Sequence, residues 1–157
     1  MSGRLLGLDY GSKTVGVAAA DALGLTVQPV ETVTRKEENK LRRTCARIEE
    51  IIKEREITGI VVGLPLHLDG EESDSSAKAQ AFGEMLRRRT GLPVYYQDER
   101  LTTVEADGIL RDTGVPRSER KTYIDAVAAC LILEDYLSRT ASSEASAEEE
   151  EENDHGK

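Results

Sequence analysis

Three acidic residues stand where a buried element is expected to begin or end. Asp9 closes a short apolar segment, Glu99 follows another, and Asp125 lies near the start of an alanine-rich apolar stretch. Open α/β sheets build their sites at the carboxyl ends of strands. A carboxylate in apolar surroundings loses hydration and needs a cation. Three carboxylates without His or Cys suit Mg²⁺ or Mn²⁺ better than Zn²⁺, and such ions activate water against a phosphodiester.

Each of these acids also has a structural explanation. Asp9 precedes Gly11 and could stabilise the turn that follows the strand. Asp125 in the first turn of a helix would favour the helix dipole. Asp98 and Glu99 are adjacent, and neighbouring side chains of a strand point to opposite faces, so we expect only one of the two in a shared site.

Hydropathy predicts the elements that must position these acids. Strands are expected at Leu5–Tyr10, Val15–Ala20, Leu25–Val33, Ile57–Leu64 and Val94–Gln97, and helices at Glu37–Arg55, Ser73–Arg89 and Tyr123–Leu137. The short connection after the first strand implies an antiparallel hairpin. Pro29 argues for an edge position or a bulge in the third strand. The expected fold class is α/β, with a mixed five-stranded sheet flanked by helices.

Length and charge predict one domain with a tail. The 157 residues suffice for a single domain of ordinary size. Residues 141–157 hold seven acids and one base, so they carry −6 of the net charge of −9 and leave −3 for residues 1–140. We expect 141–157 to be a disordered acidic tail, because it lacks large apolar residues. It could serve solubility, or it could mimic nucleic acid and compete for a basic surface of its own domain.

The cysteines and the N-terminal segment predict a cytoplasmic protein. Cys45 and Cys130 sit in apolar helical patterns without metal-type spacing, which is typical of buried free thiols in a reducing compartment. No apolar run has the length of a signal sequence or approaches the roughly 20 residues of a membrane span, so no membrane partner is expected.

Four segments together carry a family resemblance. They are Gly7-Leu-Asp-Tyr-Gly-Ser-Lys-Thr-Val-Gly-Val-Ala18, Val61-Val-Gly-Leu-Pro-Leu-His-Leu-Asp-Gly70, Asp98-Glu-Arg-Leu-Thr-Thr-Val-Glu-Ala106 and Ile124-Asp-Ala-Val-Ala-Ala129. They resemble the four signature blocks of the YqgF (RuvX) family, occur in the family's order, and frame almost all of residues 4–139. One departure is His67, where many members have Asn.

The resemblance implies a ribonuclease H-like fold related to Holliday-junction resolvases. It also implies a metal-dependent nuclease that matures the 5′ end of pre-16S ribosomal RNA, with pre-rRNA or a ribosome precursor as partner. The motif match places the catalytic and metal-binding carboxylates on Asp9, Glu99 and Asp125, with Mg²⁺ or Mn²⁺ as the cofactor.

Five further residues are expected to contact the substrate. They are Lys13, Arg100, Thr103, Arg120 and Lys121. Arg100 has an alternative role, because it could pair with a carboxylate instead of a phosphate. A chain with a net charge of −9 lacks the basic footprint of a strong nonspecific nucleic-acid binder. We therefore expect modest, salt-sensitive affinity concentrated in one patch.

Three other functions remain open on the sequence. A resolvase acting on branched DNA would use the same carboxylates but needs two active sites, and the sequence does not determine the oligomeric state. A non-catalytic RNA-binding assembly factor would keep the fold without turnover. The first hairpin also resembles the phosphate loop of actin-like and sugar-kinase ATPases, but those proteins need a second similar half, for which 157 residues are too few.

Overall fold

The computed structural model describes residues 3–65, 74–98, 108–116 and 123–141. The labelled elements are β1 (Arg4–Tyr10), β2 (Thr14–Ala20), β3 (Val27–Thr34), α1 (Arg42–Arg55), β4 (Ile57–Leu64), α2 (Asp74–Thr90) and β5 (Val94–Asp98). A short helix at 108–112 and a long one at 123–141, here called the C-terminal helix, follow. All five predicted strands are confirmed, and so are the three predicted helices.

The strands form one mixed sheet in the order β3-β2-β1-β4-β5. β1 pairs antiparallel with β2 and parallel with β4, and β4 pairs parallel with β5. β3 is an edge strand. Pro29 pairs with Ala18 at a register shift between Val17 and Ala18. Both expectations for Pro29 are therefore confirmed, because an edge position and a bulge each tolerate a residue without an N–H donor.

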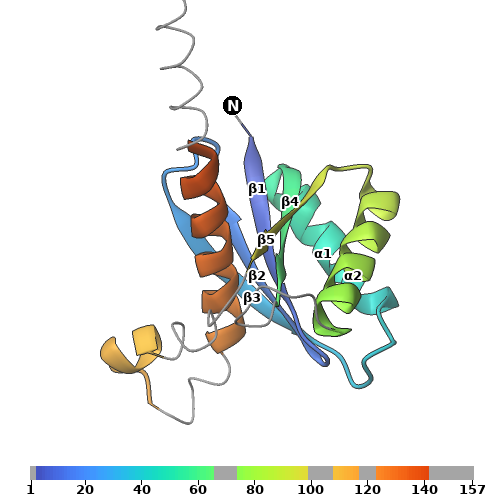
Figure 1. Cartoon of the computed structure of the whole chain (residues 1–157), viewed down its shortest axis with the longest axis horizontal. Helices are drawn as coiled ribbons and strands as arrows, with labels where there is room; N and C mark the ends of the chain where they lie inside the picture. Colours follow the sequence, from blue (N-terminus) through green and yellow to red (C-terminus); the bar gives the residue numbers. More distant parts are fainter. Residues whose placement is uncertain (1–2, 66–73, 99–107, 117–122, 142–157) are drawn as a thin grey trace, which may run out of the picture.

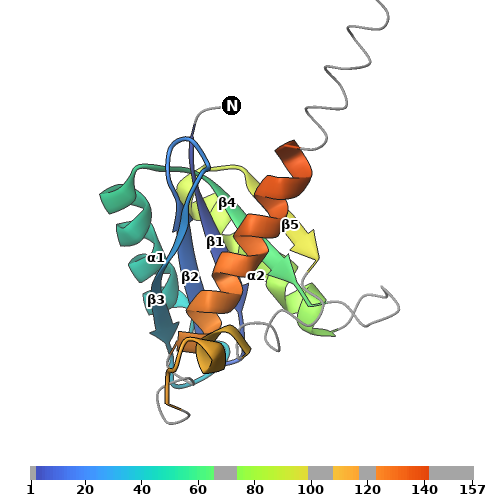
Figure 2. The same cartoon turned by 90° about the vertical axis from the view of Figure 1, so that its left-hand side faces the viewer.

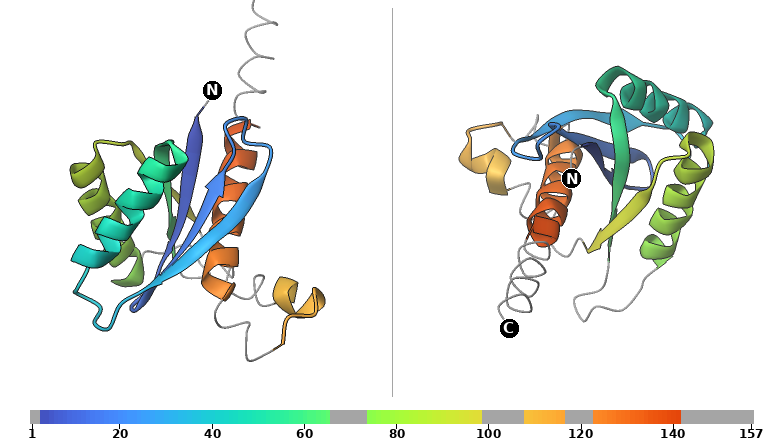
Figure 3. Two further views of the ribbon diagram at one scale, coloured as in Figure 1. Left: turned by 180° about the vertical axis from the view of Figure 1, so that it is seen from behind. Right: turned by 90° about the horizontal axis from the view of Figure 1, so that it is seen from above.

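Helices cover both faces of the sheet (Figures 1 and 2). On one face, α1 and α2 bury residues such as Ile48 and Phe82 against Leu6 and Leu8 of β1. On the other face lies the C-terminal helix, whose Leu133 packs in a cluster with residues of three strands. The view from above in Figure 3 shows the sheet between these two layers. Each fully buried Leu, Ile or Phe contributes about 1.5–3 kcal/mol.

α1 begins at Arg42, five residues later than the sequence predicts. The preceding residues form a turn in which the Lys40 N–H donates to the Glu37 carbonyl at 3.2 Å. The Glu38 carbonyl accepts a bond from the Arg35 Nε at 3.0 Å. The Arg35 side chain thus occupies the Glu38 carbonyl, which in a longer helix would accept a backbone hydrogen bond. This tertiary contact overrides the local helical pattern.

The chain direction brings several element ends to one end of the sheet. β1, β4 and β5 are parallel and all finish there, β2 and α1 begin there, and so does the C-terminal helix (lower end in Figure 1). We call this the carboxyl end of the sheet. Among the described helices, none combines the length and hydropathy that a membrane crossing requires.

Candidate functional site

Gly16 is the point at which Asp9 and Asp125 come together. Asp9 of β1 pairs directly with Gly16 of β2. A Cβ atom built on Gly16 would lie 1.9 Å from the carbonyl oxygen of Asp125 and 2.9 Å from the backbone nitrogen of Ala126. The first turn of the C-terminal helix therefore rests on the backbone of β2 at Gly16.

The side chain of Asp9 lies on the face that the C-terminal helix covers. Residues directly opposite each other in an antiparallel ladder present their side chains to the same face, and Gly16 presents the helix face. Gly7, two residues before Asp9, also contacts this helix: its Cβ would lie 2.9 Å from the Ala129 carbonyl oxygen. Asp9 and Asp125 are both half-buried, and their backbones flank Gly16 at the carboxyl end of the sheet.

The small residues on both sides of this contact explain the close approach. The sequence predicts that Ala126, Ala128 and Ala129 let the helix approach the sheet, and all three are buried. The matching glycines of the sheet, Gly7 and Gly16, are the feature that sequence analysis missed. Their signal is glycine within a strand, which marks a close backbone approach.

The side chains of β5 alternate between the two faces of the sheet. The Tyr95 ring stacks on Tyr136 of the C-terminal helix with centroids 5.5 Å apart. Two residues further, Gln97 is buried, and its Oε1 accepts a hydrogen bond from Arg139 Nη1 at 3.3 Å. Asp98 pairs with Leu64, which packs in the opposite core, beneath α1 and α2. Alternation therefore places Asp98 on the face away from Asp9.

The remaining predicted site residues lie outside the described residues. These are Glu99, Arg100, Thr103, Arg120 and Lys121, together with His67. Within the described ranges, no group of three or more His, Cys, Asp or Glu residues could hold a metal ion. Asp9 and Asp125 supply only carboxylate oxygens at their corner, which is the donor type that hard divalent cations prefer.

The cysteines do not belong to this donor set. Cys45 and Cys130 are free and buried in the core. Burial raises the pKa of Cys130 to about 12 and also raises the pKa of Cys45. Both thiols are therefore protonated at neutral pH, whereas a metal-binding cysteine is a thiolate.

Arg35 holds the turn that follows Asp9. Its Nη2 donates to the Gly11 carbonyl at 2.5 Å, and its backbone N–H donates to the Lys13 carbonyl at 2.8 Å. Its guanidinium carbon lies 4.9 Å from the centroid of the Tyr10 ring. The turn itself closes through a bond of 2.7 Å from the Gly11 N–H to the Thr14 carbonyl. The sequence carries no local signal for this role of Arg35, because its contacts with the turn span more than twenty residues.

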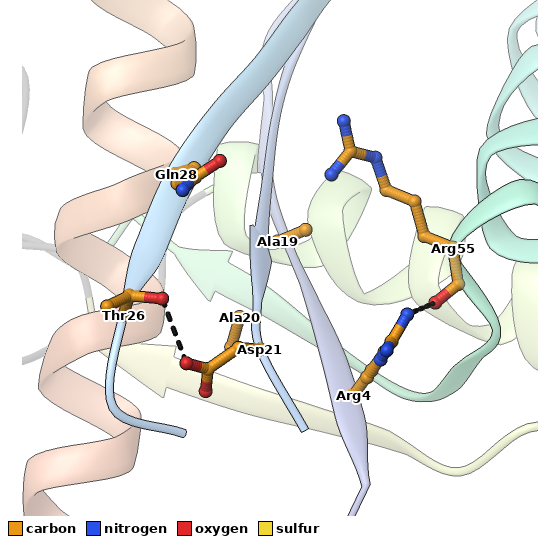
Figure 4. A pocket seen from close by; sticks show the side chains of 7 residues that line it. All are labelled: Arg4, Ala19, Ala20, Asp21, Thr26, Gln28 and Arg55. Atoms are coloured by element: carbon orange, nitrogen blue, oxygen red, sulfur yellow. Dashed lines mark hydrogen bonds between the residues drawn. The ribbon is translucent and has the colours of Figure 1, made fainter. Parts of the chain in front are cut away.

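Two hollows formed by described residues lie at the other end of the sheet. A cavity of about 180 Å³ is lined by Arg4, Ala19, Ala20, Asp21, Thr26, Gln28 and Arg55 (Figure 4). There Arg4 Nη1 donates to the Arg55 carbonyl at 3.3 Å, and the Thr26 hydroxyl donates to Asp21 at 2.9 Å. A second hollow of about 430 Å³ is lined by residues that include Leu23, Tyr136 and Leu137. Neither hollow includes Asp9 or Asp125.

Comparison with known proteins matches nearly the whole described chain. A family model described as RuvX, Holliday junction resolvase, matches residues 3–139. A protein of Lachnospira eligens is 56% identical over 134 residues, which cover 85% of this chain and 96% of that protein. A protein of Agathobacter rectalis is 52% identical over 140 residues, covering 89% and 98%. Both carry the name "Putative pre-16S rRNA nuclease".

Solved structures share the fold at low sequence identity. RuvC of Thermus thermophilus, solved with a Holliday junction substrate, has a TM-score of 0.53 at 18% identity and covers 87% of this chain and 95% of its own. The fowlpox virus resolvase with Holliday junction DNA has a TM-score of 0.54 at 6% identity, covering 87% and 98%. The architecture is therefore the ribonuclease H-like fold of the RuvC-type resolvases, as the sequence resemblance implied.

Proposed function

We propose that this chain, which belongs to the RuvX family of Holliday-junction-resolvase-like proteins, is a metal-dependent nuclease that hydrolyses phosphodiester bonds in maturation of the 5′ end of pre-16S rRNA. The observation that carries the proposal is the contact of Gly16 with both Asp9 and Asp125. The names of relatives at about half identity support RNA as the substrate.

The proposed catalytic and metal-binding set is Asp9, Glu99 and Asp125. Alternation along β5 supports Glu99 over Asp98. Tyr95 and Gln97 face the C-terminal helix, and a strand extended by one residue beyond Asp98 would carry Glu99 on the same face. Asp98 belongs to the opposite face, together with Leu64.

The carboxylates of this set would hold Mg²⁺ or Mn²⁺. When bound, such an ion activates a water molecule and stabilises the leaving oxygen of the phosphodiester. The protein's own contribution is to fix the carboxylates, because the Asp9 strand and the Asp125 helix are held in backbone contact. Lys13, Arg100, Thr103, Arg120 and Lys121 are proposed to contact the phosphates of the substrate.

The test compares cleavage of a 5′-extended 16S rRNA fragment by the parent and four variants. We expect cleavage that requires Mg²⁺ or Mn²⁺ and stops with EDTA. Asp9→Asn, Asp125→Asn and Glu99→Gln should each lower the rate about 100-fold or more, since metal coordination supplies several kcal/mol. Asp98→Asn is the matched control and should cleave like the parent. Parental cleavage by Asp9→Asn would show that the site is misassigned.

A second candidate function is resolution of branched DNA. The description of the matching family model as a Holliday junction resolvase favours it. The same variants should then be assayed on a synthetic four-way junction, where a resolvase makes paired, symmetric nicks. RNA binding without Mn²⁺ binding in calorimetry, and without cleavage of either substrate, would instead indicate a non-catalytic RNA-binding protein.

A further inference from the structure

Four exposed cations gather at the carboxyl end of the sheet, next to the candidate site. They are Lys13, Lys36, Arg42 and Arg43, and we call them the basic ridge. The bond of 2.8 Å from the Arg35 N–H to the Lys13 carbonyl holds the β1–β2 turn against the segment that leads into α1. The two connections lie together at the lower end of Figure 1. Within the described residues, none of the four cations forms an ion pair.

The acids of the same segment do not cancel this charge. Glu37 pairs with Lys40 at 3.7 Å, and Glu38 pairs with Lys78 of α2 at 2.9 Å. The hydrogen bond from Lys78 lowers the pKa of Glu38, so this carboxylate is ionised and already matched. The ridge therefore keeps an excess of positive charge on a chain whose net charge is −9.

The N-terminus of α1 adds to the positive potential of the basic ridge. Arg42 and Arg43 occupy its first turn, which contains no acidic residue, and Leu41 at the N-cap makes no side-chain capping bond. The N-terminus of a helix carries partial positive charge and unsatisfied N–H groups, so two cations are unfavourable there in the free protein. A phosphate group would relieve this repulsion, because it is the anion that such a helix end binds well.

Two arginines further along the helices, Arg47 of α1 and Arg89 of α2, have carboxylate partners instead. Arg47 pairs with Glu31 at 2.6 Å, and Arg89 pairs with Glu49 at 2.5 Å. These pairs tie helices to neighbouring elements and leave little charge for a ligand. The difference separates structural arginines from the ridge, whose charges remain available to solvent.

We propose that the basic ridge binds the phosphate backbone of the nucleic-acid strand that enters the candidate site. The proposal rests on the proposed nuclease function for the identity of the ligand. Asp9 lies on the face of the C-terminal helix, whereas α1 lies on the other face. The bound strand therefore crosses the sheet end at the β1–β2 turn, which contains Lys13.

The experiment measures binding without cleavage, in buffer with EDTA, by fluorescence anisotropy. The probes are a labelled 5′-extended 16S rRNA fragment and a labelled four-way DNA junction. For the full chain carrying Arg42→Gln and Arg43→Gln, we expect affinity for RNA to fall about tenfold. The slope of log K against log salt should become shallower by about 1.4, since each lost phosphate contact on a single strand removes about 0.7.

The matched control is Arg88→Gln, at the end of α2 on the far side of the molecule, which should change the affinity less than about twofold. A melting curve excludes misfolding, because removing cations from the positive end of α1 should leave the melting temperature equal to or above that of the parent.

The results of this experiment can support or overturn the basic ridge independently of the proposed nuclease function. Loss of binding to RNA or to the junction supports the ridge and identifies its ligand, even if the parent cleaves neither probe. Parental affinity and parental salt slope for both probes in the Arg42→Gln, Arg43→Gln variant would overturn the ridge, while metal-dependent cleavage by the parent would leave the nuclease intact.

Discussion

Asp9 and Asp125 reach one corner of the molecule because the residue between their backbones has no side chain. Gly16 pairs with Asp9 in the sheet and touches the backbone of Asp125 in the helix. Any larger residue would place a carbon atom inside the Asp125 peptide, so glycine sets the distance between the strand and the backbone of Asp125. Gly7 has the same role one turn further along the helix, against Ala129 and Leu133.

Gly16→Ala should therefore be strongly destabilising. The new Cβ would lie 1.9 Å from a backbone oxygen, which cannot move without shifting the C-terminal helix. We expect a loss of about 3 kcal/mol or more in the free energy of unfolding, measured by urea titration. Gly7→Ala, with contacts at 2.9 Å, should lose less. Gly108→Ala is the control, because the nearest atom to its Cβ is 3.9 Å away and alanine favours its helix. Equal stability of all three variants would contradict this account.

The sequence indicates which residues are candidates for the site better than it indicates which contacts they make. Asp9 and Asp125 are recognisable because each interrupts apolar surroundings, and the ambiguity between Asp98 and Glu99 is recognisable because strand side chains alternate. The direction of that alternation is not in the sequence. It depends on Tyr95 and Gln97 contacting Tyr136 and Arg139, some forty residues away.

The β1–β2 turn is held in position by a residue that follows the edge strand β3, and not by its own sequence alone. Arg35, just beyond β3, bonds the carbonyl of Gly11 through its side chain and the carbonyl of Lys13 through its backbone. It also bonds the Glu38 carbonyl and stacks over Tyr10. One guanidinium thus links the end of the Asp9 strand to the start of α1, which makes Arg35 a positioning residue.

Arg35→Lys should loosen this turn without unfolding the sheet. A lysine keeps the charge but cannot make two directed bonds and a stacking contact from one planar group. We expect faster hydrogen exchange at the Gly11 amide and a stability loss of about 1–3 kcal/mol. If the proposed nuclease function holds, kcat should fall more than KM rises. Arg47→Lys is the control, because Arg47 ties α1 to Glu31 of β3 and does not contact the turn. Unchanged exchange at Gly11 in Arg35→Lys would refute the positioning role.

Most element bounds could be predicted because apolar periodicity and Gly or Pro stop signals are local. The start of α1 could not, since the bond from Arg35 to Glu38 replaces helical bonding with a turn. The pairing of β1 with β4 also could not be predicted from local patterns, because it joins segments separated by α1.

Most of the net negative charge of the molecule lies in its C-terminal segment, and this charge repels the proposed nucleic-acid ligand. Residues 142–157 carry seven acids and one base, so two thirds of the net charge of −9 lies beyond the C-terminal helix. The basic ridge lies at the carboxyl end of the sheet, whereas the C-terminal helix ends at residue 141 at the opposite end. Repulsion between the tail and nucleic acid acts through space and therefore depends on salt.

Deleting residues 142–157 should strengthen RNA binding several-fold at about 0.01 M salt, where the Debye length is about 30 Å. The gain should shrink at about 0.1 M, where the Debye length is about 10 Å, because the tail charges are then screened from the RNA. A chain with Gln at each position of Glu148–Glu152 keeps the length of the tail and removes five charges, so it should reproduce most of the gain. Stronger binding by the deletion but not by the Gln variant would mean that the tail acts by its bulk and not by its charge. Parental affinity in both the deletion and the Gln variant would show that the tail takes no part in binding. The modest affinity expected of this chain would then be determined by the domain alone.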